Sequence, residues 1–381
     1  MKWSTRKLVD LCSIRTGKLN SNQAVENGEY PFFTCAPETL RINKFSFDTE
    51  AVLLAGNNAA GVYPLKYYKG KFDAYQRTYL FETLDENILN VRYLYYALIP
   101  VLGYFQSVSI GASTQYLTKP VLDNFELPLP SIRVQQKITN ILSAYDDQME
   151  NNLKRIALLE ESARLLYLEW FVRLRFPGHE HTRIVDGVPE GWEMTTAYEV
   201  MEVLSGGTPK TSEPEYWDGE IPFYTPKDAM RCCYILETEK TLTEKGLYKC
   251  NSRLYPKNTI FITARGTVGN LNLAQRPMAM NQSCYALRGK GEIPTFYLFC
   301  ALQAAVDQFK QRAVGAVFDA IIVDTFKLIP FVWPATKYIS VFEEQVQPIF
   351  RQVENLLLQN QKLKQSRDLL LPRLMSGEIE V

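Results

Sequence analysis

Residues 138–170 read ITNILSAYDDQMENNLKRIALLEESARLLYLEW, and this stretch decides the fold of the chain. Its apolar side chains recur at alternating steps of four and three residues, which is the spacing of a coiled-coil seam. They are Ile138, Leu142, Tyr145, Met149, Ile156, Leu159, Ala163, Leu166 and Trp170. The pattern predicts a helix that begins after Pro130 and runs to about Phe171. Such a helix is about 60 Å long, which exceeds the width of one small domain.

A second stretch near the C-terminus carries the same spacing. Its apolar frame consists of Phe342, Val346, Ile349, Val353, Leu356, Leu363, Leu370 and Leu374. Because an amphipathic helix needs a partner for its apolar stripe, we expect the two long helices to pair as an antiparallel coiled coil. Pro348 lies inside the second stretch and predicts either a kink or a late start of that helix.

Polar residues interrupt both seams, at Asn152 in the first and at Asn360 and Arg367 in the second. In an antiparallel pair, Asn152 and Asn360 lie equally far from the middle of their frames and could face each other. A buried asparagine pair costs stability but penalises slipped registers, so these two residues are candidates for setting the register. The alternative is that both side chains face solvent.

The sequence also contains an internal duplication with a period of roughly 200 residues, which is too long for a solenoid and fits a duplicated domain. The matched positions are Trp3 with Trp192, Asp10 with Glu199, Gly17 with Gly206, residues 30–34 with 221–225, and residues 125–128 with 326–330. We expect one module at residues 1–130, followed by a long helix within 131–175. The second module is expected at residues 176–335, followed by a long helix within 336–381.

Short strands and turns dominate both expected modules. In the first, Ala51–Ala55 is typical of a buried strand, and residues 62–68 and 71–81 flank Lys69-Gly70 as a predicted β-hairpin. A short helix is predicted at Val91–Leu98. The second module is expected to contain a strand at 259–264, a turn at 265–266 and a helix at 295–305. The expected fold class is therefore α+β, with two β-rich domains separated by two long helices.

Bulk composition restricts the function. Basic and acidic residues number 42 each in the 381 residues, so any nucleic-acid-binding surface must be a local patch on a neutral body. The seven cysteines form no C-x-x-C pair, which favours reduced thiols in a cytoplasmic protein. No apolar stretch approaches the ~20 residues of a membrane span, so no membrane partner is expected.

Signals for catalysis are weak. The sequence lacks a G-x-x-x-x-G-K-[ST] phosphate loop, an Asn- or Asp-Pro-Pro-aromatic motif and a glycine-rich AdoMet signature. His179 and His181 lie in an expected linker, and the adjacent Cys232 and Cys233 lack the spacing of a zinc site. Neighbouring acidic residues at 146 and 147 are expected to face solvent. We therefore predict no catalytic residue, no metal site and no cofactor on this chain.

Binding signals are stronger, because basic and amide side chains recur at matching places in both modules. Arginine and lysine suit guanine edges and phosphates, while asparagine and glutamine can pair bidentately with adenine. The candidates in the first module are Lys66, Lys69, Lys71, Gln76, Arg77 and Gln115. Those in the second are Lys210, Thr211, Lys227, Arg265, Asn281 and Gln282. Taken singly, each could equally be an ordinary solvated side chain.

With these features in place, the whole chain resembles the DNA-specificity subunit of type I restriction–modification systems. The resemblance rests on the order of several short motifs along the sequence. They are residues 3–17, 188–192, 129–130 with 135–138, 166–171 and 371–379. The start of the second helix departs from the pattern, because Pro334 is followed by Ala335-Thr336-Lys337 and Gln345 comes late.

The resemblance implies a non-catalytic adaptor. Two target-recognition domains would each read one half of a split double-stranded DNA site, and the paired helices would separate them. The helices would dock two adenine methyltransferase (modification) subunits that use AdoMet. ATP-dependent restriction subunits, which translocate and cut DNA with Mg²⁺, would join that complex. Because the two modules differ in sequence, the implied target is bipartite and asymmetric.

Two other functions remain open from the sequence. The first is a coiled-coil scaffold that joins two protein-binding modules and has no role on DNA. The second is a fused restriction–modification enzyme with its own methyltransferase, against which the missing AdoMet and Asn/Asp-Pro-Pro-aromatic motifs argue.

Overall fold

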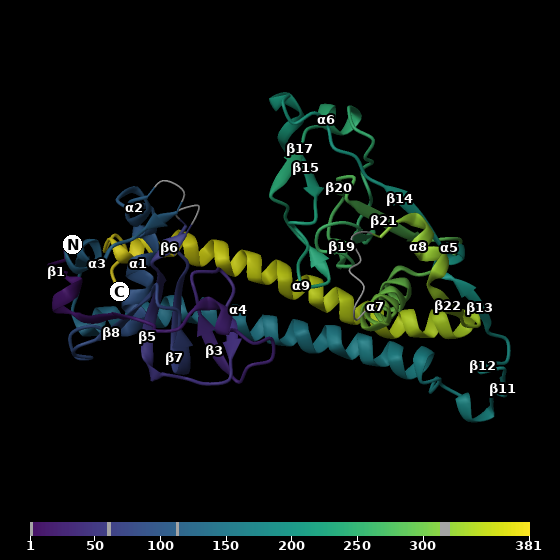
Figure 1. Cartoon of the computed structure of the whole chain (residues 1–381), viewed down its shortest axis with the longest axis horizontal. Helices are drawn as coiled ribbons and strands as arrows, with labels where there is room; N and C mark the ends of the chain where they lie inside the picture. Colours follow the sequence, from purple (N-terminus) through teal and green to yellow (C-terminus); the bar gives the residue numbers. More distant parts are fainter. Residues whose placement is uncertain (1–2, 59–61, 112–113, 313–320) are drawn as a thin grey trace. The chain divides into compact units, whose positions relative to one another are not determined.

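The chain divides into two compact units in a computed structural model (Figure 1). The structure describes residues 3–58, 62–111, 114–312 and 321–381, with the side chains of 307–312 left aside. Unit 1 consists of Met1–Met149 and Lys362–Val381, and unit 2 of Glu150–Gln361. Each unit therefore contains one β-rich body together with a segment of each long helix.

The body of unit 1 is built on a six-stranded sheet in the order β2-β8-β5-β7-β3-β4. The strands are β2 (Cys12–Thr16), β3 (Tyr30–Phe33), β4 (Leu40–Ile42), β5 (Phe47–Ala55), β7 (Leu65–Ala74) and β8 (Thr78–Thr83). Neighbouring strands are antiparallel except β3 and β7, which pair in parallel through Phe32 with Asp73 and Phe33 with Ala74. Helix α1 (Val91–Leu98) contributes Tyr93 and Leu94 to the core beside Val52 and Phe81 of the sheet.

Smaller elements complete unit 1. Strand β1 (Thr5–Lys7) pairs with β10 (Glu126–Pro128), and β6 (Asn57–Asn58) pairs with β9 (Gln115–Tyr116), both antiparallel. The remaining helices are η1 (Leu8–Asp10), η2 (Ser21–Gln23), η3 (Ile99–Val101), α2 (Leu102–Ser107) and α3 (Lys119–Asp123).

The predicted strand at 51–55 and helix at 91–98 are confirmed, but the predicted hairpin at Lys69-Gly70 is wrong. β7 passes straight through these residues, because it pairs with β5 along its length, with Thr49 opposite Gly70. Gly70 stays in the strand with a φ of +132°, which glycine adopts at little cost. A turn instead lies between β7 and β8, at residues 75–77, where the Thr78 N–H donates to Tyr75 O at 2.8 Å.

Unit 2 contains a five-stranded sheet in the order β14-β21-β18-β19-β16 and a three-stranded sheet in the order β17-β15-β20. These strands are β14 (Met201–Ser205), β15 (Trp217–Tyr224), β16 (Tyr234–Ile235), β17 (Lys240–Leu242), β18 (Ile260–Thr263), β19 (Leu271–Ala274), β20 (Ala279–Met280) and β21 (Cys284–Gly289). Two-stranded pairs are formed by β11 (Ile184–Val185) with β12 (Val188–Pro189), and by β13 (Glu193–Thr196) with β22 (Pro330–Trp333). The helices are η5 (His179–His181), α5 (Ala197–Val200), η6 (Pro214–Tyr216), α6 (Glu244–Tyr248), α7 (Thr295–Arg312) and α8 (Val323–Leu328). The strand and helix expected at 259–264 and 295–305 are confirmed, and α7 is longer than predicted.

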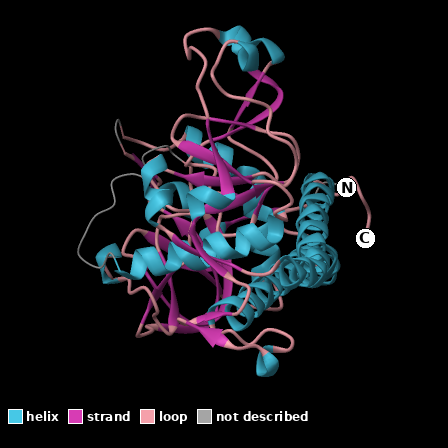
Figure 2. Cartoon of the chain, turned by 90° about the vertical axis from the view of Figure 1, so that its right-hand side faces the viewer, coloured by secondary structure: helices cyan, strands magenta, loops and turns pink. Residues whose placement is uncertain are grey.

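The two bodies share one topology, which explains the duplicated sequence. The order β2-β8-β5-β7 matches β14-β21-β18-β19, and the parallel pair β3·β7 matches β15·β20. Likewise, β1·β10 matches β13·β22. This last match corrects the predicted alignment of residues 125–128 with 326–330. Lys7 and Thr196 occupy equivalent positions, and they pair with Glu126 and Pro330, so residues 127–130 correspond to 331–334. Helix and strand mix in both bodies, and the α+β class is confirmed (Figure 2).

The long helices are α4 (Ile132–Tyr167), continued by a π-helical turn η4 (Leu168–Val172), and α9 (Thr336–Met375). The two helices run antiparallel within each unit: Asp146 contacts Arg367 in unit 1, and Asn152 contacts Asn360 in unit 2 (Figure 1). Of the two outcomes expected at Pro348, a kink or a late start of the second helix, the late start is wrong. α9 begins two residues after Pro334, just as α4 begins two residues after Pro130, and it runs through Pro348.

A helix tolerates an interior proline where the carbonyl that loses its N–H partner can be hydrated. Pro348 is exposed, and so is Glu344, whose carbonyl lies one turn earlier. Water can therefore replace the missing hydrogen bond, which accounts for the uninterrupted helix.

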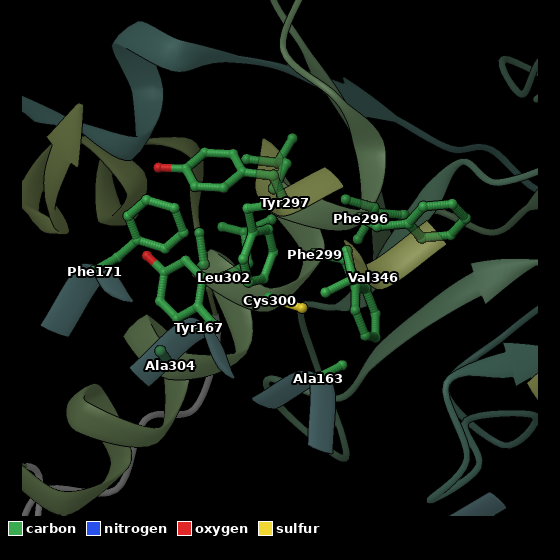
Figure 3. Close-up of a cluster of buried hydrophobic side chains, with 14 of the residues drawn as sticks. Ala163, Tyr167, Phe171, Phe296, Tyr297, Phe299, Cys300, Leu302, Ala304 and Val346 are labelled. Atoms are coloured by element: carbon green, nitrogen blue, oxygen red, sulfur yellow. The ribbon is translucent and has the colours of Figure 1, made fainter. Parts of the chain in front are cut away.

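The core of unit 2 gathers side chains from three helices. Figure 3 shows Tyr167 of α4, Tyr297 of α7 and Val346 of α9 in one cluster, with Phe171 beside them. The ring centroids of Phe171 and Tyr297 lie 5.2 Å apart in an edge-on contact. Burial raises the pKa of both Tyr167 and Tyr297.

Among the described helices, none has both the length and the apolar character that a membrane span needs.

Candidate nucleic-acid interface

Four loops meet at one end of the unit 1 sheet, at residues 17–20, 34–36, 56–58 and 75–77. We call them the first loop cluster. The last loop holds the other three through its backbone. The Gly56 N–H donates to Arg77 O at 2.8 Å, the Tyr75 N–H to Phe33 O at 2.8 Å, and the Gln76 N–H to Leu19 O at 2.9 Å. The thiol of Cys35 also donates to Arg77 O, at 3.4 Å. These bonds fix the loop backbones and leave the side chains of Gln76 and Arg77 exposed.

Unit 2 repeats this arrangement with residues 206–211, 225–228, 264–269 and 281–283, the second loop cluster. The Ala264 N–H donates to Ser283 O at 2.8 Å, and the Asn281 N–H donates to Tyr224 O at 3.0 Å. These bonds match those made by Gly56 and Tyr75 in unit 1. The third loop is further tied to the second by Thr267 Oγ1, which donates to Pro226 O at 3.3 Å. The two bodies therefore present the same four loops on the same frame.

The glycines that open each cluster explain part of the duplication. A Cβ at Gly17 would lie 1.9 Å from Ala74 O, and one at Gly206 would lie 2.3 Å from Asn281 O. Only glycine allows the first loop to pass so close to the backbone at the start of the last loop.

Three of the six candidates predicted for the first module lie in or beside the first loop cluster. Gln76 donates through Nε2 to Asn20 Oδ1 at 2.9 Å. The guanidinium carbon of Arg77 lies 5.1 Å from the ring centroid of Tyr116, and a hydrogen bond with this tyrosine raises the pKa of Arg77. Gln115 lies on β9, opposite Asn58 of the third loop. Arg77 is therefore held on an aromatic face at an exposed position, which suits contact with a base edge or phosphate.

The three lysines predicted with them lie along β7, because there is no hairpin tip at Lys69-Gly70. Lys66 is half-buried and donates to Ala36 O at 3.1 Å and Glu38 O at 2.9 Å, so it braces the second loop. Burial lowers the pKa of Lys66. Lys69 forms an ion pair of 2.8 Å with Glu50, and Lys71 lies 4.8 Å from the ring centroid of Phe45. The structure does not bring Lys69 and Lys71 into the cluster.

The second loop cluster contains all six candidates predicted for the second module. Lys210, Thr211, Lys227, Arg265 and Gln282 are exposed, and Asn281 is half-buried. The Lys210 carbonyl accepts from Trp217 Nε1 at 3.2 Å, and Asn281 Oδ1 accepts from the Ser283 N–H at 3.0 Å. Lys227 approaches Glu239 at 3.9 Å, a surface contact that holds it only weakly. Gln282 accepts a hydrogen bond from Thr208 Oγ1.

Several cluster residues were missed from the sequence, namely Asn20, Asn57, Asn58, Tyr116 and Thr208. Asn57 Oδ1 is buried and has no hydrogen-bond partner within the described residues. Because Gly56 corresponds to Ala264, Asn57 occupies the position that Arg265 takes in unit 2.

One group of described side chains could hold a metal ion. The ligand atoms of Glu160, Cys232 and Cys233 lie within 4.8 Å of one another. However, Glu160 Oε1 already accepts from the Cys233 N–H at 2.6 Å and from Cys232 Sγ at 3.3 Å. Burial also raises the pKa of the Cys233 thiol, which opposes the thiolate that a metal requires. Three donors fall short of a structural zinc site, so the group serves to anchor the start of β16 to α4.

The structure brings the two asparagines of the helix pair together. Asn152 is fully buried in unit 2 and donates through Nδ2 to Asn360 Oδ1 at 2.8 Å and to Gln359 Oε1 at 3.1 Å. The solvent-facing alternative therefore fails for Asn152. Their role in setting the register remains a prediction.

The expectation that residues 146 and 147 face solvent is wrong for Asp146 and confirmed for Asp147, which is exposed. In unit 1, Asp146 accepts at 2.5 Å from both Arg367 and the Tyr96 hydroxyl. Asp147 forms an ion pair of 2.5 Å with Arg92. The two carboxylates point to different partners because adjacent helical positions lie on different faces.

Residues 1–161 and 189–365 each match the family model described as the type I restriction modification DNA specificity domain. The chain belongs to this family. Each matched specificity domain contains one loop cluster. The resemblance inferred from the sequence, the predicted role in DNA specificity and the fold class are thereby confirmed.

Individual relatives agree. The chain is 38% identical to the type I restriction enzyme EcoDI specificity subunit of Escherichia coli over 154 residues, covering 40% of this chain and 33% of that protein. It is 23% identical to the HindI specificity subunit of Haemophilus influenzae over 361 residues, covering 77% and 79%. The crystal structure of a type I restriction–modification S subunit from M. genitalium shares the fold, with a TM-score of 0.56 at 18% identity over 98% of this chain and 95% of that one.

Proposed function

We propose that the two loop clusters are the DNA-reading surfaces of this specificity subunit, one for each half of a split site. The observation that carries the proposal is the common frame. Both clusters share two backbone hydrogen bonds, from Gly56 and Tyr75 in unit 1 and from Ala264 and Asn281 in unit 2, yet they present different side chains at equivalent positions. Arg77 corresponds to Ser283, and Arg265 corresponds to Asn57. A constant frame with variable side chains is what sequence-specific reading requires.

The chemistry of the exposed groups fits base recognition. The forked guanidinium of an arginine pairs with the O6 and N7 atoms of guanine, and each such bidentate contact contributes about 1–3 kcal/mol of discrimination. Arg77 and Arg265 would supply these contacts from different loops of their clusters. Because the arginine is placed differently in the two clusters, the two half-sites should differ, and the full target should be asymmetric.

The zero formal net charge is consistent with selective binding. A neutral body gains little from the phosphate attraction that drives non-specific binding. We therefore propose that specificity comes from combining the base discrimination of the two loop clusters. The paired helices α4 and α9 would set the separation that selects the length of the gap between half-sites.

We further propose that this chain contributes recognition and no catalysis. Two modification subunits that use AdoMet would methylate adenine, and restriction subunits that use ATP and Mg²⁺ would cut DNA. The chain itself would need no cofactor. The proposed complex would act in the cytoplasm, where thiols remain reduced.

The test is to map methylated adenines in host cells that express the complete complex with Arg77→Ala or Arg265→Ala. Each variant should relax the motif at one half-site and leave the other half unchanged. A scaffold without a role on DNA would give no motif that depends on this chain. If both variants gave the wild-type motif, the loop clusters would not be the reading surfaces.

A further inference from the structure

Both loop clusters place a glutamine at the centre of their last loop. Gln76 lies between Tyr75 and Arg77, and Gln282 lies between Asn281 and Ser283. The backbone bonds from Tyr75 to Phe33 and from Asn281 to Tyr224 show that the two glutamines occupy equivalent positions. Both side chains are exposed, so burial does not demand glutamine at either place.

Each glutamine side chain binds the first loop of its own cluster. Gln76 Nε2 donates to Asn20 Oδ1 at 2.9 Å in unit 1. In unit 2, Thr208 Oγ1 donates to Gln282 Oε1. The partner and the direction of the hydrogen bond both change, while the link between the first and last loops is kept. Because both clusters keep a side-chain hydrogen bond between the first and last loops, although the bonded groups differ, the connection between these loops is the feature that both clusters require.

In unit 1 this side-chain link adds to the backbone bond from the Gln76 N–H to Leu19 O, and it acts on the exposed part of the first loop. The first loop starts at Gly17 or Gly206, where the chain passes against the backbone, and then continues as an exposed segment with Lys18 and Asn20, or with Thr208 and Lys210. An exposed polar segment that must be ordered on binding loses affinity through conformational entropy. A hydrogen bond to the rigid last loop orders it in advance.

We infer that Gln76 and Gln282 are positioning residues that fix the first loop of each cluster against its last loop. This inference rests on the proposed function of the clusters. It assigns the two glutamines a role different from direct pairing with adenine, because one end of each amide is already engaged within the protein.

The test is a double-mutant cycle in the complete complex, measuring Kd for DNA and the methylated motif. Asn20→Ala and Gln76→Ala should each raise Kd about fivefold, the size expected for one lost hydrogen bond. The double variant should also raise Kd about fivefold, whereas independent contacts would multiply to about 25-fold. The motif should relax at one half-site only, so the other half-site is an internal control.

A swap provides the rescue. Asn20→Gln with Gln76→Asn keeps one amide on each loop and roughly the same combined side-chain length, so it should restore most of the affinity and the motif. In unit 2, Thr208→Ser should behave as wild type because it keeps the hydroxyl, and Thr208→Ala should relax the second half-site. Thermal unfolding of every variant would separate loop effects from loss of the fold.

Two outcomes would overturn the inference. If Asn20→Ala were silent while Gln76→Ala relaxed the motif, Gln76 would read a base directly. If the single effects multiplied in the double variant, the two residues would act independently. Failure of the proposed function is distinguishable, because Arg77→Ala and Arg265→Ala would then leave binding unchanged as well.

Discussion

Asn152 of α4 donates a side-chain hydrogen bond of 2.8 Å to Asn360 of α9. In unit 2, Asn152 is fully buried, and an amide without a partner would be costly there. The bond therefore favours the one alignment in which the two amides meet.

Breaking this bond should destabilise unit 2. Asn152→Ala should lower the free energy of unfolding by about 1–3 kcal/mol, because the Asn360 amide loses a buried partner. Leu153→Ala is the matched control, since Leu153 is 55% exposed on the same helix. Denaturant titration measures both. Replacing both asparagines with leucine should retain or raise the free energy of unfolding, while the alignment of α4 with α9 becomes less strictly fixed. If the single and double variants lost the same free energy of unfolding, that would contradict a role of the pair in register.

The ion pair between Asp146 and Arg367 should matter more than surface pairs do. The side chains are only 21% and 16% exposed, and removing Arg367 leaves a partly buried carboxylate. We expect Arg367→Ala to cost about 2 kcal/mol or more, toward the range for broken buried pairs. Lys154→Ala breaks the Lys154–Glu150 pair, which is 71% and 65% exposed, and should cost no more than about 0.5 kcal/mol. Equal effects in the two variants would show that burial does not strengthen the first pair.

Gly17→Ala should impair DNA reading because its Cβ would collide with Ala74 O. The first loop would have to move, so we expect the first half-site to lose discrimination by about tenfold, equivalent to about 1.4 kcal/mol. Gly103→Ala is the control, since nothing lies within 4 Å of that Cβ and Gly103 is in helix α2. The control should gain up to about 1 kcal/mol of stability. DNA binding by the complex with half-site variants measures the first effect, and wild-type discrimination in Gly17→Ala would refute it.

The stability of unit 2 should depend on pH through the carboxyl group of Glu343. Burial raises the pKa of Glu343, although its carboxylate accepts hydrogen bonds from the Phe296 and Tyr297 N–H groups. A raised pKa in the folded state means that protonation favours folding, so stability is lost as the pH rises through that pKa. Glu343→Gln should therefore gain stability relative to wild type as the pH increases from about 4 to 7.

Thermal unfolding across that pH range measures the Glu343 effect, with the exposed neighbour Glu344→Gln as the control. A difference between Glu343→Gln and wild type that stayed constant with pH would exclude this linkage.

The sequence predicted the repeated architecture well, because apolar periodicity and recurring motifs are local properties. The seam of α4 and the strand at Ala51–Ala55 could be read directly. The hairpin at Lys69-Gly70 was predicted wrongly because glycine occurs in strands as well as in turns, and only the pairing of β7 with β5 decides between them. The late start at Pro348 was predicted wrongly because the cost of an interior proline depends on hydration of one carbonyl, which the sequence does not reveal.

The two loop clusters could be predicted only in part. Gln76, Arg77 and Gln282 were predicted because basic and amide side chains recur at matching places in both copies. Tyr116 was missed because it reaches Arg77 from a segment almost 40 residues away in sequence, and no local pattern links them. The lysines on β7 were predicted from their charge alone, which does not show that Glu50 already neutralises Lys69.

Unit 1 is assembled from two separated pieces of sequence, and Leu371 and Leu374 of its last helix turns lie in the same core as Leu8 and Ile138. During synthesis on the ribosome, unit 2 is complete once residue 361 has emerged, whereas this core still awaits Leu371 and Leu374. Residues 1–149 must therefore remain without their closing helix segment while the nested unit is translated. A nascent chain stalled before residue 370 should expose apolar surface in unit 1 to chaperones, and release of the last turns should conceal it.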